Sequence, residues 1–122
     1  MNTYEQGMAA RRRVLGDAYV DRAVDATTPL DEDFQRWITE AAWGSVWTRP
    51  GLDPRTRSLV TIAILAALER EELALHLEAG SRTGAALTEI AEVLFHVGVY
   101  AGIAAANSAF RRVKALQGVD DD

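Results

Sequence analysis

Cysteine is absent from this sequence of 122 residues. Without a thiol, the chain forms no disulfide, holds no metal through thiolates and has no cysteine nucleophile or redox pair. Proline is scarce as well: three are present, each just before or at the start of an apolar segment. The apolar residues between these few breaks recur at helical spacing throughout the chain.

Long apolar runs and an excess of basic charge are also missing. The longest apolar run, Ile62 to Leu68, is far below the roughly 20 residues needed to cross a bilayer, and the N-terminus has no apolar signal core. We therefore expect a cytoplasmic protein with no membrane partner. The formal net charge is −5 and no basic stripe is sustained, so we expect no nucleic-acid partner either.

The one basic cluster is Arg11-Arg12-Arg13, close to the N-terminus. Three adjacent residues of a helix point in different directions, so these side chains form no common face. We interpret the cluster as a solvated turn of the N-terminal helix or as a salt-bridged contact between subunits.

The length and a hydrophobic content of 48% predict a single domain over residues 1–122, and the helical spacing predicts an all-α fold, a compact bundle of about six helices. The acidic segment 118–122 is expected to be a disordered tail. The expected helices cover residues 3–15, 17–25, 32–47 and 55–68, then a segment through His76 that ends at Thr83-Gly84, and finally residues 89–114.

Capping residues and small residues mark where several helices end and pack. Asp53 is expected as N-cap and Pro54 as the first residue of the fourth helix, while Thr88 is expected to cap the last one. Gly84 offers a left-handed C-cap. The small residues at 101–106 allow a close approach of another backbone, either inside the fold or across a subunit interface.

The stretch 43–59 combines two tryptophans, three arginines and a proline-containing turn. Trp43 and Trp47 share one helical face, a pattern typical of core packing and equally of the apolar wall of a ligand pocket. Arg49 and Arg57 follow, and a guanidinium binds a carboxylate through two parallel hydrogen bonds. The stretch therefore suits a site for a small organic acid, with Arg57 as the preferred arginine; exposed partners of nearby acids are the alternative.

Two histidines each follow a glutamate by four residues: Glu72 precedes His76, and Glu92 precedes His96. A carboxylate one turn away can orient an imidazole and favour its protonated form, which suits an acid catalyst acting on an anionic intermediate. His76 stands on the more polar helix and is the stronger catalytic candidate. The apolar neighbours of His96 are equally typical of a core histidine with a hydrogen-bond partner.

These histidines and glutamates do not form a recognised metal-binding pattern. Glu72 and His76 supply at most two ligands from one helix, and no second pair is marked to complete a site of four. We therefore expect no metal. A phosphate-binding glycine loop, a nucleophile elbow and a dinucleotide fingerprint are also missing, so no cofactor is expected.

Four separated motifs stand in order along the chain. They are Tyr4-Glu5-Gln6-Gly7 with Arg13-Val14-Leu15-Gly16-Asp17 and Val20-Asp21-Arg22, the stretch 43–59, Glu72-Leu73-Ala74-Leu75-His76, and Phe95-His96-Val97-Gly98-Val99-Tyr100-Ala101-Gly102 with Ala105-Ala106-Asn107. Together they resemble the carboxymuconolactone decarboxylase family over almost the whole chain. The resemblance implies an alkylhydroperoxidase-like fold and a homo-oligomer, a trimer or hexamer, with a pocket between subunits as one possibility.

Related alkylhydroperoxidase-type proteins use a CxxC motif followed by a histidine. Counting back from His76, this chain has Glu69 and Glu72 at the two cysteine positions, so thiol peroxidase chemistry is excluded. Two further departures affect geometry more than chemistry. Ala104 stands where the family commonly has proline, and the run Leu68-Glu69-Arg70 stands where a glycine is usual.

The resemblance implies cofactor-independent decarboxylation of 4-carboxymuconolactone, a dicarboxylate lactone, to the 3-oxoadipate enol-lactone in protocatechuate (β-ketoadipate) breakdown. The site residues that it implies are His76, Glu72 and Arg57 as catalytic groups and Arg49, His96, Trp43 and Trp47 as substrate-binding groups. His76 would be the electrophilic or acid group, Glu72 its orienting partner or the proton carrier, and Arg57 a carboxylate clamp. Two alternatives stay open: a superfamily enzyme acting on another lactone or unsaturated acid, and a non-catalytic oligomeric helical binding or scaffold protein.

Overall fold

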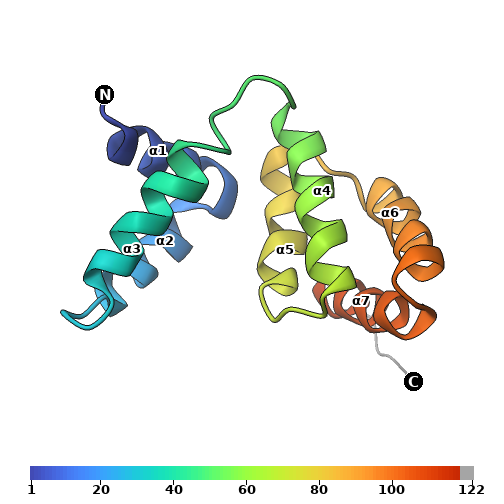
Figure 1. The fold of residues 1–122 in the computed structure, drawn as a ribbon. Coiled ribbons are helices and arrows are strands. Elements are labelled where there is room, and N and C mark those ends of the chain that lie inside the picture. Colours follow the sequence, from blue (N-terminus) through green and yellow to red (C-terminus); the bar gives the residue numbers. More distant parts are fainter. Residues whose placement is uncertain (119–122) are drawn as a thin grey trace. The chain divides into compact units, whose positions relative to one another are not determined.

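The computed structural model describes residues 1–118, and all regular structure in that range is helical. In chain order the elements are α1 (Thr3–Leu15), α2 (Asp17–Ala26), α3 (Glu32–Ile38), the π-helical segment η1 (Thr39–Gly44), α4 (Pro54–Ala67), α5 (Leu73–Thr83), α6 (Leu87–Tyr100) and α7 (Ile103–Leu116) (Figure 1). The all-α class is confirmed. Of the expected tail, residues 119–122 lie outside the described residues.

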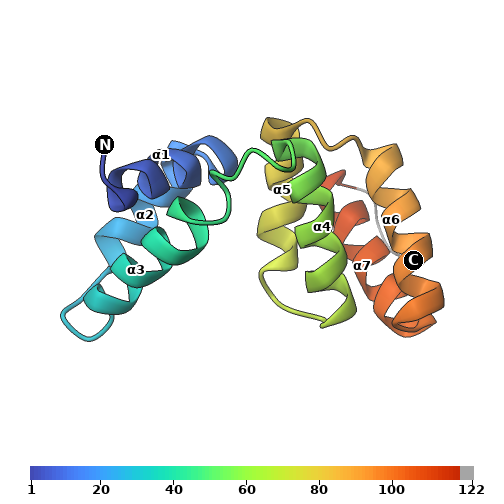
Figure 2. The same cartoon turned by 45° about the horizontal axis from the view of Figure 1, so that its top comes forward.

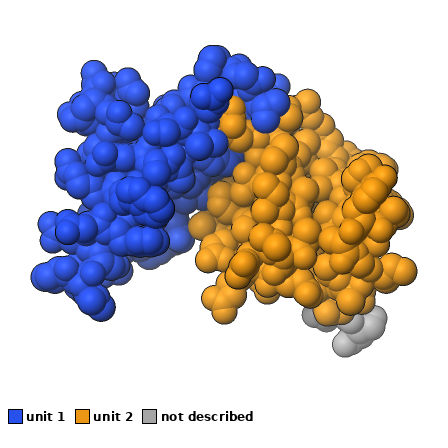
Figure 3. All heavy atoms as spheres, in the orientation of Figure 1, with its two compact units in different colours: residues 1–54 blue, residues 55–122 orange. Residues whose placement is uncertain are grey.

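The chain divides into two compact units, unit 1 with residues 1–54 and unit 2 with residues 55–122 (Figure 3). Unit 1 ends at Pro54. Pro54 is also the first residue of α4, as the signal at Asp53-Pro54 predicted. Each unit has its own helix packing and is described by itself. The single domain over residues 1–122 stays a prediction.

Unit 1 is held together by the close packing of α1 against η1. A Cβ atom added to Gly7 would overlap the carbonyl oxygen of Thr39, and one added to Gly44 would overlap the carbonyl of Thr3. Only glycine permits such an approach of two backbones. At the start of α1, the side chain of Asn2 accepts a hydrogen bond of 2.8 Å from the backbone N–H of Glu5 and caps the helix.

The continuous helix expected over residues 32–47 is wrong, because α3 ends at Ile38 and residues Thr39–Gly44 form the wider π-helical segment η1. Two hydroxyl groups bond to backbone carbonyls here: Thr39 Oγ1 donates to Gln35 O at 2.7 Å and Ser45 Oγ to Glu40 O at 2.9 Å. Such local side-chain bonds compete with the regular helical ladder and often bend it. The irregular segment lies where α1 makes its closest backbone contact.

Unit 2 contains α4, α5, α6 and α7 around one apolar core, and Figures 1 and 2 show α4 running beside α5. Its largest fully buried apolar side chains come from three different helices: Ile62 of α4, Leu73 of α5, and Ile90 and Leu94 of α6. Helix α7 adds small residues such as Ala105, Ala106 and Ala109. Helix α4 contributes Ile62 and Ala66 to this core, whereas its Val60 and Ile64 are exposed.

The single helix expected over residues 89–114 is wrong as well. Its first part is α6 and its second part is α7, separated at Gly102, which has φ 122°. Residues with a Cβ rarely adopt that conformation, so glycine here ends α6 and lets the chain reverse. A Cβ on Gly98 would lie 3.4 Å from the Cβ of Ala106, which shows how closely the two helices pack inside the fold. The N-cap of α6 is Ala86 rather than Thr88.

The connection from α4 to α5 turns at Glu69, whose φ is 54° and whose backbone is therefore left-handed. The backbone N–H of Arg70 donates to Leu65 O at 3.0 Å, and that of Glu69 donates to Ala66 O at 3.2 Å. These two bonds form a Schellman motif, which usually has glycine at its left-handed residue. This chain has Glu69 at that residue and therefore accepts backbone strain there. Helix α5 ends in the expected left-handed cap at Gly84, with φ 90°.

Candidate active site

A groove of about 700 Å³ lies between α4 and α6 in unit 2. Its walls are mainly apolar, and the lining residues are Thr56, Leu59, Val60, Ala63, Ile64 and Ala67 from α4 and Glu92, Val93, His96, Val97, Tyr100 and Ala101 from α6 and its end. The two helices run in the same direction, and an ion pair between Arg55 and Glu89 joins their N-terminal ends (Figure 1). A second carboxylate oxygen of Glu89 accepts the backbone N–H of Ala86 at 3.1 Å, which fixes the start of α6.

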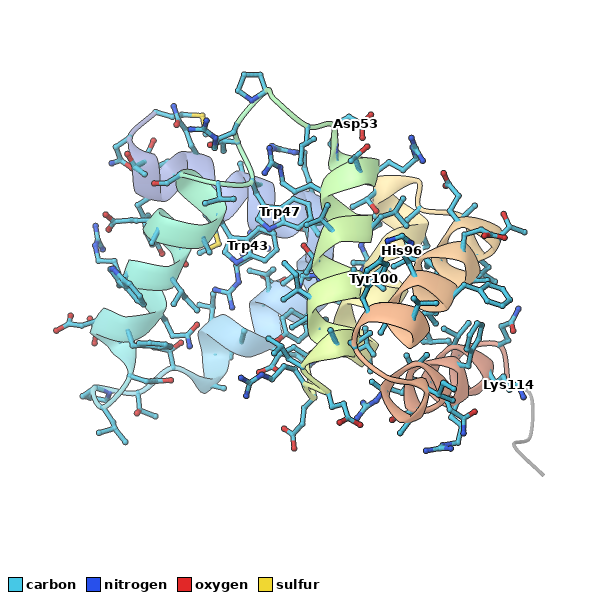
Figure 4. The ribbon with its side chains drawn as sticks, turned by 45° about the vertical axis from the view of Figure 1, so that its right-hand side comes forward. Trp43, Trp47, Asp53, His96, Tyr100 and Lys114 are labelled. Carbon is cyan, nitrogen blue, oxygen red and sulfur yellow. The ribbon has the colours of Figure 1, made fainter. Side chains whose placement is uncertain are left out.

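His96 is exposed to this groove and lies against Tyr100, with 4.8 Å between the ring centroids (Figure 4). Glu92, His96 and Tyr100 succeed one another at four-residue intervals and line the groove along one face of α6. The structure therefore places His96 at a ligand-sized opening, and its role in substrate binding stays a prediction. A buried core position, the other interpretation of His96, is excluded by its exposure.

His76 lies in the first turn of α5 and is half-buried, with a buried Nδ1 atom. Its backbone N–H donates to the carbonyl of Glu72, the N-cap residue of α5, at 3.2 Å. Burial lowers the pKa of His76 below its ordinary value of 6.5, and the carboxylate of Glu72 opposes this shift but is the smaller effect. The lowered pKa favours the neutral imidazole at pH 7, and Glu72 favours the protonated form, as expected for a carboxylate one turn away, without outweighing burial.

Arg57 belongs to the start of α4, is half-buried and has a buried Nε atom. Its backbone carbonyl accepts the hydroxyl of Thr61 at 2.9 Å, within the regular helix. The neighbouring Thr56 lines the groove at His96, whereas Arg57, Glu72 and His76 are outside the set of lining residues. Of the four predicted site residues in unit 2, His96 lines the groove and the other three do not.

Trp43 and Trp47 stack on each other at the C-terminal end of η1, with 5.2 Å between the ring centroids and 24° between the ring planes (Figure 4). Trp43 is buried and Trp47 is half-buried. Arg49 is exposed in the following turn, where its backbone N–H donates to Val46 O at 3.1 Å. The predicted pairing of the two indoles on one face is therefore confirmed, although the π-helical turn replaces the expected α-helix.

The predicted site residues are shared between the two units. Trp43, Trp47 and Arg49 belong to unit 1, and the other four belong to unit 2. Their meeting in one pocket stays a prediction. Within residues 1–118, no three His, Asp or Glu side chains come together as a possible metal site, and no helix is long and apolar enough to span a membrane.

Sequence reasoning missed the groove itself and two of its polar lining residues, Thr56 and Tyr100. The four-residue spacing from His96 to Tyr100 was visible and could have placed both rings on one face of α6. The partner helix α4 could not be found in this way, because its pairing with α6 depends on the chain reversal through α5.

Comparison with known proteins gives the same family over both units. A sequence model of the carboxymuconolactone decarboxylase family matches residues 32–115. The 4-carboxymuconolactone decarboxylase of Acinetobacter baylyi is 47% identical over 114 residues, which cover 93% of this chain and 85% of that protein. The nitrosuccinic acid decarboxylase npaB of Metarhizium robertsii is 40% identical over 100 residues, covering 81% of this chain and 70% of that protein.

The family match includes the stacked tryptophans, the Glu72–His76 turn, both walls of the groove and the α6–α7 reversal. The relative from Acinetobacter baylyi extends the similarity over nearly the whole chain. Together with the all-helical fold, these matches show that the chain belongs to the carboxymuconolactone decarboxylase family.

Proposed function

We propose that this protein is a carboxy-lyase that converts 4-carboxymuconolactone to the 3-oxoadipate enol-lactone with release of CO2. The observation that carries the proposal is the identity of 47% over 93% of the chain with a protein named for this reaction. A cytoplasmic step of protocatechuate breakdown, without a cofactor, is the corresponding role.

The substrate supplies its own electron sink, which explains why no cofactor is needed. When the carboxylate carbon leaves as CO2, the electron pair of the broken bond moves through the ring double bond to the lactone carbonyl and forms a dienolate. Protonation at carbon then gives the enol-lactone. The protein therefore has to orient a dianion, stabilise the developing oxyanion and deliver one proton. Preorganised hydrogen-bond donors at such an oxyanion contribute on the order of 3 kcal/mol each.

His76 is the proposed electrophile at the lactone carbonyl. Its lowered pKa favours a neutral imidazole with one N–H group, which can donate to the developing oxyanion. Because the imidazole carries no charge, its burial does not require a charged group to lose its water. Glu72 favours the protonated form of His76, and so does the negative charge of the substrate. Binding of the dianion can therefore raise the pKa of His76. Glu72 is accordingly the positioning residue for His76, or the carrier of the proton.

Arg57, assisted by Arg49, is the proposed clamp for a carboxylate of the substrate, because a planar guanidinium matches a carboxylate with two hydrogen bonds. Trp43 and Trp47 would cover the site and exclude water. His96 would line the pocket or share the acid role. The stacked indoles and the half-buried guanidinium of Arg57 support these assignments.

A second substrate class is favoured by the relative named nitrosuccinic acid decarboxylase, which is 40% identical over 81% of this chain. Loss of CO2 beside a nitro group places the electron pair on the nitro oxygens, just as loss from the lactone places it on the carbonyl oxygen. One site with a carboxylate clamp and an oxyanion donor therefore suits both reactions. Another small dicarboxylic acid with an adjacent electron sink is the alternative substrate.

The test is a coupled ultraviolet assay in which the preceding cycloisomerase generates 4-carboxymuconolactone in the presence of the purified, chelator-treated protein. Rapid formation of the enol-lactone and CO2 supports the proposal, and nitrosuccinic acid offered in parallel measures the second candidate. Turnover of nitrosuccinic acid alone would replace the proposed substrate. A folded protein that turns over neither compound would favour the non-catalytic scaffold.

We also propose that the protein is a homo-oligomer, a trimer or hexamer. Large apolar side chains are exposed in a row on α6 and at the start of α7, where Phe95 is 66%, Val99 79% and Ile103 82% exposed. A second copy that packs here would remove this surface from water. Light scattering on Val99→Glu should show a smaller species than the wild type, whereas Leu30→Glu in unit 1, at a residue 96% exposed, should leave the mass unchanged. Equal masses for all three proteins would contradict the assignment of this face.

A further inference from the structure

The three arginines at 11–13 have different surroundings, and Arg11 is the unusual one. Arg12 forms ion pairs with Asp17 at 3.1 Å and Asp21 at 2.9 Å, and Arg13 is exposed. Arg11 is only 7% exposed and forms no ion pair with an acidic side chain of the described residues. A guanidinium is always charged, so this position buries a charge that has no ion pair among the described residues.

Arg11 lines a cavity of about 410 Å³ that lies wholly within unit 1. Helices α1 and α3 form its sides, with contributions from the ends of α2 and from η1. The polar lining residues are Tyr4, Arg11, Thr27, Glu32, Asp33, Gln35, Arg36 and Thr39. None of the residues proposed for decarboxylation is among them.

Arg11 has an unused hydrogen-bond donor, whereas the neighbouring Arg36 is engaged with other residues. The buried Nε atom of Arg11 has no hydrogen-bond partner, and its Nη2 makes one long bond of 3.4 Å to Gln35 Oε1. Arg36 already pairs with Glu40 at 3.3 Å and covers the ring of Tyr4 at 4.6 Å. The Nε and a terminal nitrogen of one guanidinium form the parallel pair of donors that a carboxylate accepts.

The two threonines of the cavity are likewise engaged with the backbone. Thr27 Oγ1 donates to Ala23 O at 3.0 Å, and Thr39 Oγ1 donates to Gln35 O at 2.7 Å. Glu32 and Asp33 line the cavity from the exposed first turn of α3. Their negative charges disfavour a polyanion such as a phosphate ester and leave room for a ligand of low charge.

We propose that this cavity is a second binding site, which takes a small organic carboxylate whose carboxylate group accepts two hydrogen bonds from Arg11. The ligand supplies an ion-pair partner for Arg11, which it does not have among the described residues. Gln35 holds the guanidinium in place on one side, and the acidic residues of α3 accept hydrogen bonds from donor groups at the other end of the ligand. The site is independent of the proposed decarboxylation, because it shares no residue with it.

Nitrogen-15 NMR of the arginine side chains tests the proposal in the full-length protein, with lactate as the probe, a monoanion that carries a hydroxyl donor. The Nε–H signal of Arg11, assigned by its loss in Arg11→Lys, should shift saturably with lactate. Neutral lactamide, and sodium chloride at equal ionic strength, should leave it in place. A signal that does not move would show that water alone fills the cavity, and an equal shift with chloride would indicate an adventitious ion only; either result overturns the proposal.

Two isosteric substitutions sharpen this test without removing the guanidinium. Gln35→Glu places a carboxylate of the protein beside Arg11, so lactate binding should weaken by about tenfold or more, the range for a lost charged hydrogen bond, and the thermal midpoint should rise. Gln6→Glu, the same change at an exposed residue of α1, should bind lactate as the wild type does. Unchanged affinity in Gln35→Glu would contradict the assignment to Arg11.

Discussion

The two Glu–His pairs of unit 2 have the same sequence spacing and different environments. His76 begins α5 half-buried, and burial lowers its pKa despite the carboxylate of Glu72. His96 lies further along α6, exposed to a groove and next to the ring of Tyr100. A glutamate one turn away therefore does not by itself decide the charge of a histidine, because desolvation can outweigh it.

The difference also separates two chemical roles. A half-buried neutral imidazole is a directed hydrogen-bond donor or acceptor whose charge can change when an anion arrives. An exposed imidazole beside a tyrosine, at the edge of an apolar groove, is better suited to contact a ligand than to stabilise a charged intermediate. The proposed chemical step is therefore that of His76, and the proposed role of His96 is contact with the ligand.

The largest expected effect is the loss of turnover in His76→Gln. Removing an electrophile or proton donor should lower kcat by about 100-fold or more. The matched change His96→Gln should lower kcat less than about tenfold and act mainly on KM, as expected for a pocket wall. The coupled ultraviolet assay measures both variants, after circular dichroism has shown that each is folded. Equal losses of kcat in the two variants would remove the distinction between the histidines.

The second effect is on the pH dependence of stability. The pKa of His76 is lower in the folded protein than its ordinary value of 6.5, so the unfolded chain takes up a proton first as the pH falls. The contribution of neutral His76 to the free energy of unfolding is therefore complete above pH 6.5. It is lost as the pH falls toward the pKa that His76 has in the folded protein. Urea unfolding at about pH 7.5 and about pH 5 should show a smaller loss of stability in His76→Gln than in the wild type.

His96→Gln is the control for this experiment, because His96 is exposed. Its loss of stability between the two pH values should match that of the wild type. If the stabilities of His76→Gln and the wild type had the same pH dependence, burial would not lower the pKa of His76 in the folded protein.

A third, smaller effect concerns Glu72. The charge of Glu72 raises the pKa of His76, so Glu72→Gln should lower that pKa further. NMR titration of the imidazole protons measures the shift directly. Glu92→Gln, the same change in the other pair, should leave the titration of His76 where it is. A rise in the pKa of His76 in Glu72→Gln would show that the carboxylate acts on His76 in some other way than by its charge.

The smallest effect is expected at the turn that leads into the helix of His76. Glu69 has a left-handed backbone with φ 54°, whereas the corresponding reversal before α7 uses Gly102. Glu69→Gly should raise the free energy of unfolding by about 0.5 to 1 kcal/mol, since a left-handed residue with a Cβ costs about 1 to 2 kcal/mol and glycine is more flexible when unfolded. Urea unfolding measures it, with Glu71→Gly at the neighbouring exposed residue as the control. No gain over Glu71→Gly would mean that the turn is unstrained.

The sequence predicted the helices with clear end signals and failed where tertiary contacts decide. Gly16 and Gly84 marked the ends of α1 and α5, and Asp53-Pro54 marked the start of α4. The apolar spacing of residues 89–114 gave no sign that Gly102 would reverse the chain, because glycine is also tolerated within helices. The π-helical turn at Thr39–Gly44 depends on the packing of α1, which is far away in the sequence.

For the site, residue types were more predictable than their electrostatics. The motifs indicated His76, Arg57 and the stacked pair Trp43 and Trp47, because carboxylate binding and aromatic cover follow from the side chains themselves. The neutral state of His76 and the buried charge of Arg11 could not be predicted, since burial comes from helices that pack from elsewhere in the chain.

The pH profile of kcat/KM for 4-carboxymuconolactone tests most directly whether a neutral His76 carries out the reaction. If neutral His76 acts, the rate is level across pH 7 and falls only below pH 6.5, at the lowered pKa of His76, and Glu72→Gln moves this fall to still lower pH. A rate that instead rises as the pH drops through 6.5 would show that the protonated imidazole is the active form in the free enzyme, and would contradict a reaction carried out by neutral His76.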